Sequence, residues 1–162
     1  MSDPVLEALA ATGHGFEVVA CDPALADTAD FCATYGYTLE ESANAIVVIG
    51  KSNPPVHVIC LALADSRVDV NHTVRKRLGV RRASFASAEV TRKLTGMEIG
   101  GVTPFGTSEA LPLWIDERIM ACQRVIIGGG SRDRKFLVPP AALLAHPQAE
   151  VVEGLGVVID AG

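Results

Sequence analysis

The residues best suited to chemistry lie in the segment Thr95–Gly106, which holds four glycines and one proline among apolar side chains. Glycines let the backbone take positive φ and let a ligand approach bare N–H groups, and Gly100 and Gly101 are adjacent here. Pro104 fixes the direction in which the chain leaves the loop and holds Thr103 extended. N–H donors fixed in this way suit an oxyanion or a carbonyl oxygen. An equally weighted alternative is a tight crossover between strands, in which the glycines serve packing alone.

Other catalytic motifs are incomplete. The sequence Gly50-Lys51-Ser52 resembles the end of a phosphate-binding loop, but Ala45 stands where that motif needs glycine, and Pro54-Pro55 blocks the helix that should follow. No GxSxG segment or Ser, His and Asp pattern indicates serine chemistry. Cys32 is the best candidate for a thiol nucleophile, but its apolar neighbours favour a core residue.

The four cysteines show no CxxC spacing, and the four histidines are equally scattered. This pattern predicts reduced thiols, no metal site and no cofactor. The N-terminus lacks the basic start of a signal peptide, and no apolar run approaches the roughly 20 residues of a membrane span. We therefore expect a cytoplasmic protein with no membrane contact.

The 162 residues, 49% apolar and 20% charged, suit one globular domain over residues 1–162. Helices are expected after Asp3, after Asp27 or Thr28, after Asn71 and after Ser87, ending near Gly13, Gly36, Gly79 and Gly96, with a further helix opened by Pro139-Pro140. Strands are expected at 16–19, 44–49, 56–61, 113–115, 124–127 and 136–138, the second and third forming a hairpin. Because these elements do not alternate as βαβ units, a mixed α+β sheet is favoured over a doubly wound one.

Charge is unevenly distributed around the net value of -5. The chain before Lys51 carries eight acidic residues and no Lys or Arg, whereas the stretch from Arg75 to Lys93 carries seven of the fourteen basic residues. If the basic residues converge, an acidic protein still presents a local phosphate-binding face. The alternative, which we favour before the fold is considered, is that they are solvated helix faces.

Three motifs in order carry a family resemblance: Gly100–Gly106, then Leu111–Asp116, then Ile127–Arg132. With the helix opened by Thr28-Ala29, the hairpin, and Val68-Asp69-Val70 leading into a helix, the chain resembles the YbaK/EbsC (ProX-like) aminoacyl-tRNA editing family over essentially its whole length. The family is related to the editing insertion of prolyl-tRNA synthetases. The resemblance implies an α+β fold in which a mixed, mostly antiparallel pseudo-barrel sheet is capped by helices. It also implies trans-editing: hydrolysis of the ester of a mischarged tRNA that carries a small amino acid, typically Ala or Cys on tRNA(Pro).

The resemblance also implies roles for residues. Gly100 and Gly101 would bind the ester carbonyl, and Asn44 would hydrogen-bond near the terminal ribose. The substrate-binding residues would be Thr28, Thr103, Pro104, Phe105, Gly106, Gly128, Gly129 and Arg132. Contacts to acceptor-stem phosphates would come from Arg75, Lys76, Arg77, Arg81 and Arg82. The expected partner is the acceptor end of an aminoacyl-tRNA, with no metal.

Two departures from the family pattern concern charge. The family lysine near the start of the strand after the second helix is Asn44 here. Lys51 cannot replace it, because a shifted alignment puts prolines into the next strand, and in its own place it lies roughly 23 Å along the strand on the opposite face. Lys135 stands where deacylases of Cys-tRNA carry an aspartate, so their substrate does not transfer directly.

The loss of the lysine leaves alternatives open. Aminoacyl esters are labile, so a positioned water and backbone N–H donors can accelerate attack without a nucleophilic side chain. A non-catalytic module that binds a tRNA 3' end or a small molecule with the same pocket is the second interpretation. A regulatory partner of an aminoacyl-tRNA synthetase, acting through the acidic N-terminal face, is the third.

Overall fold

The computed structural model describes residues 3–159. Its helices are α1 (Pro4–Ala11), α2 (Thr28–Tyr35), α3 (Arg75–Leu78), α4 (Ala88–Thr95) and α5 (Glu117–Met120). Short 3-10 turns cover Pro23–Leu25, Leu39–Glu41 and Pro140–Ala145, and a π-helical turn covers Val70–Val74. The strands are β1 (Glu17–Ala20), β2 (Ala43–Gly50), β3 (Val56–Leu63), β4 (Ser66–Val68), β5 (Ala83–Phe85), β6 (Leu113–Asp116), β7 (Val125–Gly128), β8 (Arg134–Val138), β9 (Ala149–Val152) and β10 (Gly156–Val158).

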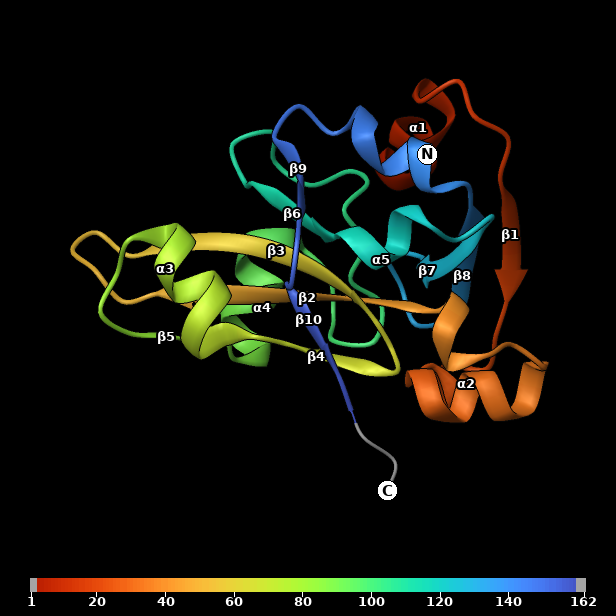
Figure 1. The fold of residues 1–162 in the computed structure, drawn as a ribbon. Coiled ribbons are helices and arrows are strands. Elements are labelled where there is room, and N and C mark those ends of the chain that lie inside the picture. The colour runs from red at the N-terminus through yellow and green to blue at the C-terminus, as the bar shows by residue number, and fades with distance from the viewer. Residues whose placement is uncertain (1–2, 160–162) are drawn as a thin grey trace.

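The strands of the described chain form three sheets, with the strand orders β5-β2-β3-β6-β9, β1-β8-β7 and β10-β4 (Figure 1). The pairings β3–β6 and β6–β9 are parallel and the other five are antiparallel, so the predicted mixed, mostly antiparallel arrangement is found. The expected pseudo-barrel is not: within residues 3–159 no sheet closes on itself. An isolated bridge from Ser42 to Ile126 joins the five-stranded and three-stranded sheets, and no strand pairing joins them elsewhere in residues 3–159. The fold is therefore an open mixed α/β arrangement.

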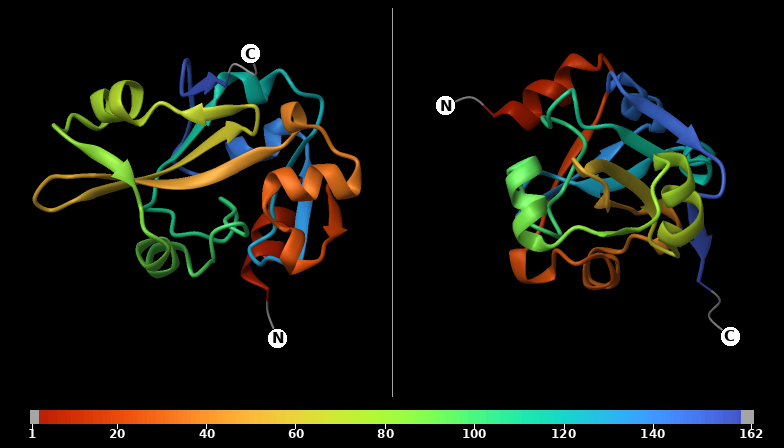
Figure 2. Two further views of the ribbon diagram at one scale, coloured as in Figure 1. Left: turned by 90° about the horizontal axis from the view of Figure 1, so that it is seen from below. Right: turned by 90° about the vertical axis from the view of Figure 1, so that its left-hand side faces the viewer.

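The hairpin β2–β3 is the centre of the largest sheet, with α3 and α4 on opposite faces of it (Figure 2). Side chains alternate along both strands, so Val47, Ile59 and Leu61 enter one core while Val48 and Cys60 enter another. Both faces are covered, which explains the unbroken apolar run of β3. This rigid hairpin carries the first residues of β2 to the edge of the three-stranded sheet.

Helix caps account for most of the predicted boundaries. Ser87 accepts a hydrogen bond from the Val90 N–H at 3.1 Å, and Gly96 ends α4 with φ of 74°. Gly36 ends α2 in the same way. The prediction of Asn71 as a helix cap was wrong. Asp69 is the cap, because its side chain accepts from the His72 N–H and its carbonyl accepts from Val74, which opens the helix with a π turn at Val70.

Candidate functional site

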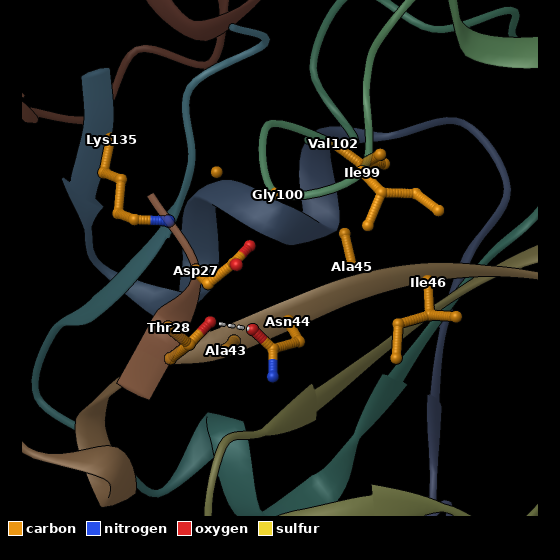
Figure 3. A pocket seen from close by; sticks show the side chains of 11 residues that line it. Asp27, Thr28, Ala43, Asn44, Ala45, Ile46, Ile99, Gly100, Val102 and Lys135 are labelled. Atoms are coloured by element: carbon orange, nitrogen blue, oxygen red, sulfur yellow. Dashed lines mark hydrogen bonds between the residues drawn. The ribbon is translucent and has the colours of Figure 1, made fainter. Parts of the chain in front are cut away.

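A cavity of about 190 Å³ lies where the start of β2 meets the three-stranded sheet (Figure 3). Its lining comes from the start of α2, the first half of β2, the glycine loop before β6 and the facing ends of β7 and β8. The lining residues are Asp27, Thr28, Ala43, Asn44, Ala45, Ile46, Ile99, Gly100, Val102, Gly128 and Lys135. Four predicted site residues, Thr28, Asn44, Gly100 and Gly128, are thus brought together from segments far apart in the sequence.

The cavity sits at an open strand edge. β5 pairs with Val48–Gly50 and leaves the first half of β2 without a partner on that side. Along β2 the Ser42 carbonyl accepts from Ala64 on the β3 side, and the Val47 carbonyl accepts from Ala86 on the β5 side. By this alternation Ala45 directs its N–H and C=O toward the open edge, where no strand of the described chain pairs with it. These two backbone groups are available to a ligand.

Asn44 and Thr28 form the polar floor of the cavity. The Thr28 hydroxyl donates a hydrogen bond to the Asn44 side-chain oxygen (Figure 3). Thr28 is the first residue of α2, so this bond joins the helix start to β2. The amide nitrogen of Asn44 donates no hydrogen bond within residues 3–159 and remains a donor for a ligand.

The two adjacent glycines of the loop, Gly100 and Gly101, differ in their hydrogen bonds and in their place relative to the cavity. Gly100 lines the cavity with φ of 93°, and its N–H has no acceptor in the described chain. Gly101 instead donates its N–H to the Glu98 carbonyl at 2.9 Å, and its own carbonyl accepts from Gly130 at 2.7 Å. A Cβ at Gly101 would lie 2.9 Å from the Ser131 carbonyl carbon. The expectation that both glycines offer donors is therefore corrected: the Gly101 N–H is occupied, and Gly100 alone has a free one.

Arg132 ties this loop to the start of α2. Its guanidinium donates to the Ile99 carbonyl at 2.8 Å and to the Pro23 carbonyl at 3.0 Å, and it pairs with Asp27 at 3.3 Å. A Cβ at Gly100 would overlap the guanidinium. Arg132 therefore fixes the loop from behind the cavity wall, and Gly100 is the residue that this close approach requires.

Lys135 is the cavity residue that sequence reasoning noted but did not place in the site. It lies on β8, is 6% exposed, and directs its ammonium group toward the cavity, 5.1 Å from the Phe31 ring centre (Figure 3). No ion pair of the described residues includes it. Burial lowers the pKa of this ammonium group, since desolvation disfavours its charged form. The available signal was a lysine directly before the apolar run of the strand predicted at 136–138.

The remaining glycine-loop residues lie elsewhere. Pro104, Phe105 and Gly106 line a second cavity of about 260 Å³ together with parts of α1 and the segment around His146. Thr103 is fully buried, and its hydroxyl has no hydrogen-bond partner in the described chain. The structure therefore separates these residues from the cavity of Asn44 and Gly100. Gly129 is also outside the lining, and its carbonyl accepts from Arg134 at 2.7 Å.

The predicted RNA-contacting residues lie at the far end of β2. β5 joins Gly50 through Ala83, about 20 Å along the strand from Asn44. Arg77 pairs with Glu150 at 3.3 Å and stacks over Trp114, and Arg75 donates to the Asn71 carbonyl. The other three, which form no ion pair within residues 3–159 and are exposed, are Lys76, Arg81 and Arg82.

No group of three or more His, Cys, Asp or Glu side chains within residues 3–159 is placed to hold a metal ion. No helix of this part of the chain has the length and apolar character needed to cross a membrane.

Residues 22–145 match the aminoacyl-tRNA editing domain. The chain belongs to this family. The editing domain is 28% identical over 110 residues to the uncharacterized protein YwhH of Bacillus subtilis (strain 168), which covers 68% of each chain. It superposes on a candidate trans-editing enzyme for prolyl tRNA synthetase with a TM-score of 0.78 and 25% identity, over 94% of this chain and 97% of the other.

The editing domain also has the fold of the hypothetical protein APE2540, with a TM-score of 0.84 and 22% identity over 96% of this chain and 100% of the other. The family resemblance read from the sequence is thus confirmed. The match begins at Asp22 and ends at Ala145, so it includes every residue that lines the cavity of Asn44.

Proposed function

We propose that this editing domain is a trans-acting deacylase that hydrolyses the ester between a small amino acid and the 3' end of a mischarged tRNA. The observation that carries the proposal is the cavity of Asn44, Thr28 and Gly100, with its unpaired N–H donors and small volume. Membership in the editing family supports this choice of chemistry.

The size of the cavity favours a small acyl group. About 190 Å³ is less than the roughly 300–1,000 Å³ of ordinary small-molecule sites. Its apolar walls come from Ala43, Ala45, Ile46 and Val102, which suit a short side chain. The Asp27 carboxylate, 67% exposed at the side chain, is placed to attract the α-ammonium group of an aminoacyl ester. The cavity therefore suits an uncharged small amino acid bound through its α-ammonium and carbonyl groups.

The reaction needs donors more than a nucleophile. Water attacks the ester carbonyl carbon, negative charge develops on the carbonyl oxygen, and the bond to the ribose oxygen breaks as this oxygen takes a proton. The Gly100 N–H would donate to the carbonyl oxygen, and the Asn44 amide would donate to a ribose hydroxyl. Arg132 keeps Gly100 in place before the substrate arrives, which lowers the cost of ordering the loop.

The exposed cations Lys76, Arg81 and Arg82 would contact acceptor-stem phosphates. Their position about 20 Å along β2 from Asn44 lets the 3' end reach the cavity while the stem lies over α3 and β5. We expect the affinity for the partner, aminoacyl-tRNA, to fall steeply as the salt concentration rises.

The second candidate is a non-catalytic module that binds the tRNA 3' end or a small molecule in the same cavity. Asn44 favours it, because the amide has no charge to stabilise an oxyanion. A deacylation screen separates the two. The purified protein is incubated with tRNAs charged with Ala, Ser, Cys, Thr, Gly or Pro, and ester loss is compared with spontaneous hydrolysis. The deacylase proposal requires faster loss of at least one ester, whereas binding to a non-hydrolysable 3'-amide analogue without any turnover supports the binding module.

A further inference from the structure

We propose that the Lys135 ammonium group is the cationic catalyst of this site: it contacts the carbonyl oxygen of the aminoacyl ester and stabilises the negative charge that develops there. The inference rests on the proposed deacylase function. It assigns to β8 a charge that the start of β2 lacks, since Asn44 and Lys135 line the same cavity from different sheets (Figure 3).

The first argument is the missing counterion. Lys135 is 6% exposed, yet no carboxylate of the described chain lies within ion-pair distance of its ammonium. Among residues 3–159, Asp27 is the single carboxylate in the cavity lining, and it pairs with Arg132 at 3.3 Å instead. A buried cation without a partner is costly, and such groups concentrate at functional sites. A ligand that brings negative charge next to Lys135 would offset this cost.

The second argument is the direction of the donors. Gly100 and Lys135 line the cavity from different elements, the glycine loop and β8, and each has a donor that no residue of the described chain engages by hydrogen bond or ion pair (Figure 3). Two donors from different elements can converge on one oxygen of a bound ester. The Lys135 ammonium lies over the Phe31 ring, 5.1 Å from its centre, and this cation–π contact leaves its N–H donors without a hydrogen-bond acceptor.

The third argument selects the carbonyl oxygen over an acidic side chain of the substrate. The side chains of Ala43, Ala45 and Val102 in the cavity wall are apolar, and the described lining holds no second cationic side chain to pair with a carboxylate. In a small neutral aminoacyl ester the carbonyl oxygen is the atom that gains negative charge during attack. Lys135 transfers no proton in this step: water forms the new bond to carbon, the ribose oxygen leaves, and the proton from water passes to that oxygen.

The test compares Lys135→Met, which keeps the length of the side chain and removes the charge, with the exposed control Lys51→Met. Single-turnover deacylation is measured on the tRNA that the wild type hydrolyses fastest. We expect the rate constant of Lys135→Met to fall by about 100-fold or more, as for loss of an oxyanion donor. The Kd for the 3'-amide analogue should change by less than about threefold, because the contact strengthens only in the transition state. Lys51→Met should match the wild type.

Rescue distinguishes chemistry from structure. In Lys135→Met, the second change Asn44→Lys places an ammonium in the same cavity from the other sheet. We expect the double variant to hydrolyse the ester at least about tenfold faster than Lys135→Met alone. In the wild type, Asn44→Lys should raise the deacylation rate by a smaller factor than it does in Lys135→Met, because two ammonium groups in one cavity repel each other. Thermal unfolding should show Lys135→Met folded, with an unchanged or higher Tm. If that variant does not fold, Lys135→Gln takes its place.

Three results would overturn the inference, and they are distinguishable from one another. A wild type that hydrolyses a small aminoacyl ester together with a Lys135→Met variant of equal rate rejects the lysine and leaves the deacylase function intact. Asp- and Glu-charged tRNAs are measured beside this set, and a loss confined to them assigns Lys135 to side-chain recognition. A wild type without any turnover on the whole set rejects the deacylase function and the role of Lys135 together.

Discussion

The Arg132 guanidinium donates a hydrogen bond to the Ile99 carbonyl at 2.8 Å, across 33 residues of sequence, and so fixes the residue that precedes Gly100. The same side chain reaches the Pro23 carbonyl and the Asp27 carboxylate at the start of α2. The free N–H of Gly100 therefore depends on a residue that does not line the cavity.

The first prediction concerns this clamp. Arg132→Met removes the bonds to Ile99, Pro23 and Asp27, so the loop should sample several positions and deacylation should fall by about 10- to 100-fold. The measurement is kcat/KM on the best aminoacyl-tRNA. Arg124→Met is the control, since Arg124 is 58% exposed at the side chain and pairs loosely with Glu17 at 3.7 Å. If Arg132→Met keeps the wild-type kcat/KM, the loop around Gly100 does not need Arg132 to hold its position.

The second prediction separates the two glycines. Gly100→Val places a branched side chain at φ of 93° and against Arg132, so binding of the 3'-amide analogue and any turnover should both fall. Gly101→Ala should mainly lower stability, by about 1–3 kcal/mol, because its Cβ meets the Ser131 backbone at 2.9 Å. Analogue titration and denaturant unfolding check the pair. If Gly100→Val folds and binds the 3'-amide analogue with wild-type affinity, the loop glycines serve packing alone.

The third prediction concerns RNA. The triple variant Lys76→Glu, Arg81→Glu and Arg82→Glu should bind tRNA more weakly, and the slope of log affinity against log salt should shrink by about 2–3 units. Hydrolysis of a short aminoacyl-nucleotide mimic, which has no stem, should hardly change. Arg67→Glu, at an exposed position on β4, controls for charge reversal alone. If the triple variant keeps wild-type tRNA affinity in filter binding at several salt concentrations, these three residues do not contact the RNA and are a solvated surface.

The fourth prediction is a pH dependence of stability. Arg118 donates two hydrogen bonds to Asp65, at 2.9 and 2.8 Å, and they hold the pKa of Asp65 below its ordinary value of 3.8. A lowered folded-state pKa means that the stabilisation is present above about pH 4 and is lost as pH falls through the folded-state pKa. Asp65→Asn should therefore cost about 1–2 kcal/mol at pH 7 and progressively less below pH 4. Urea unfolding at pH 7 and pH 3 checks this, and an equal cost at both would contradict it.

Local signals predicted much of the fold. Ser87 and Gly96 bound α4, Gly36 ends α2, and the hairpin of β2 and β3 is found in the expected place. The short strands β4, β5, β9 and β10 were missed, because their formation depends on partners distant in sequence: β5 joins β2, β9 joins β6 in parallel, and β10 joins β4. The open sheet arrangement depends on the same long-range pairings and was not visible in the sequence.

The membership of the cavity was predictable only in part, since four of the eleven predicted catalytic and substrate-binding residues line it. The family resemblance grouped Thr28, Asn44, Gly100 and Gly128, and the structure places them around one cavity. Whether they contact a substrate stays a prediction. The engagement of the Gly101 N–H by Glu98 follows from the turn geometry, which glycine spacing alone does not determine.

Lys135 is the clearest case of information that only the fold supplies. Its side chain faces the cavity because β8 pairs with both β1 and β7 in a particular register. A shift of one residue would turn it to the other face of the sheet. The sequence showed an unusual lysine at this position, and the pairing of the strands gives its direction.

The most direct test of the central claim is single-turnover deacylation of small aminoacyl-tRNAs by the wild type and by Gly100→Val, with circular dichroism to confirm that both are folded. The account predicts that the wild type hydrolyses at least one of these esters faster than spontaneous hydrolysis and that Gly100→Val loses this acceleration. Ester loss at the spontaneous rate with the wild type, on every tRNA of the set, would contradict it.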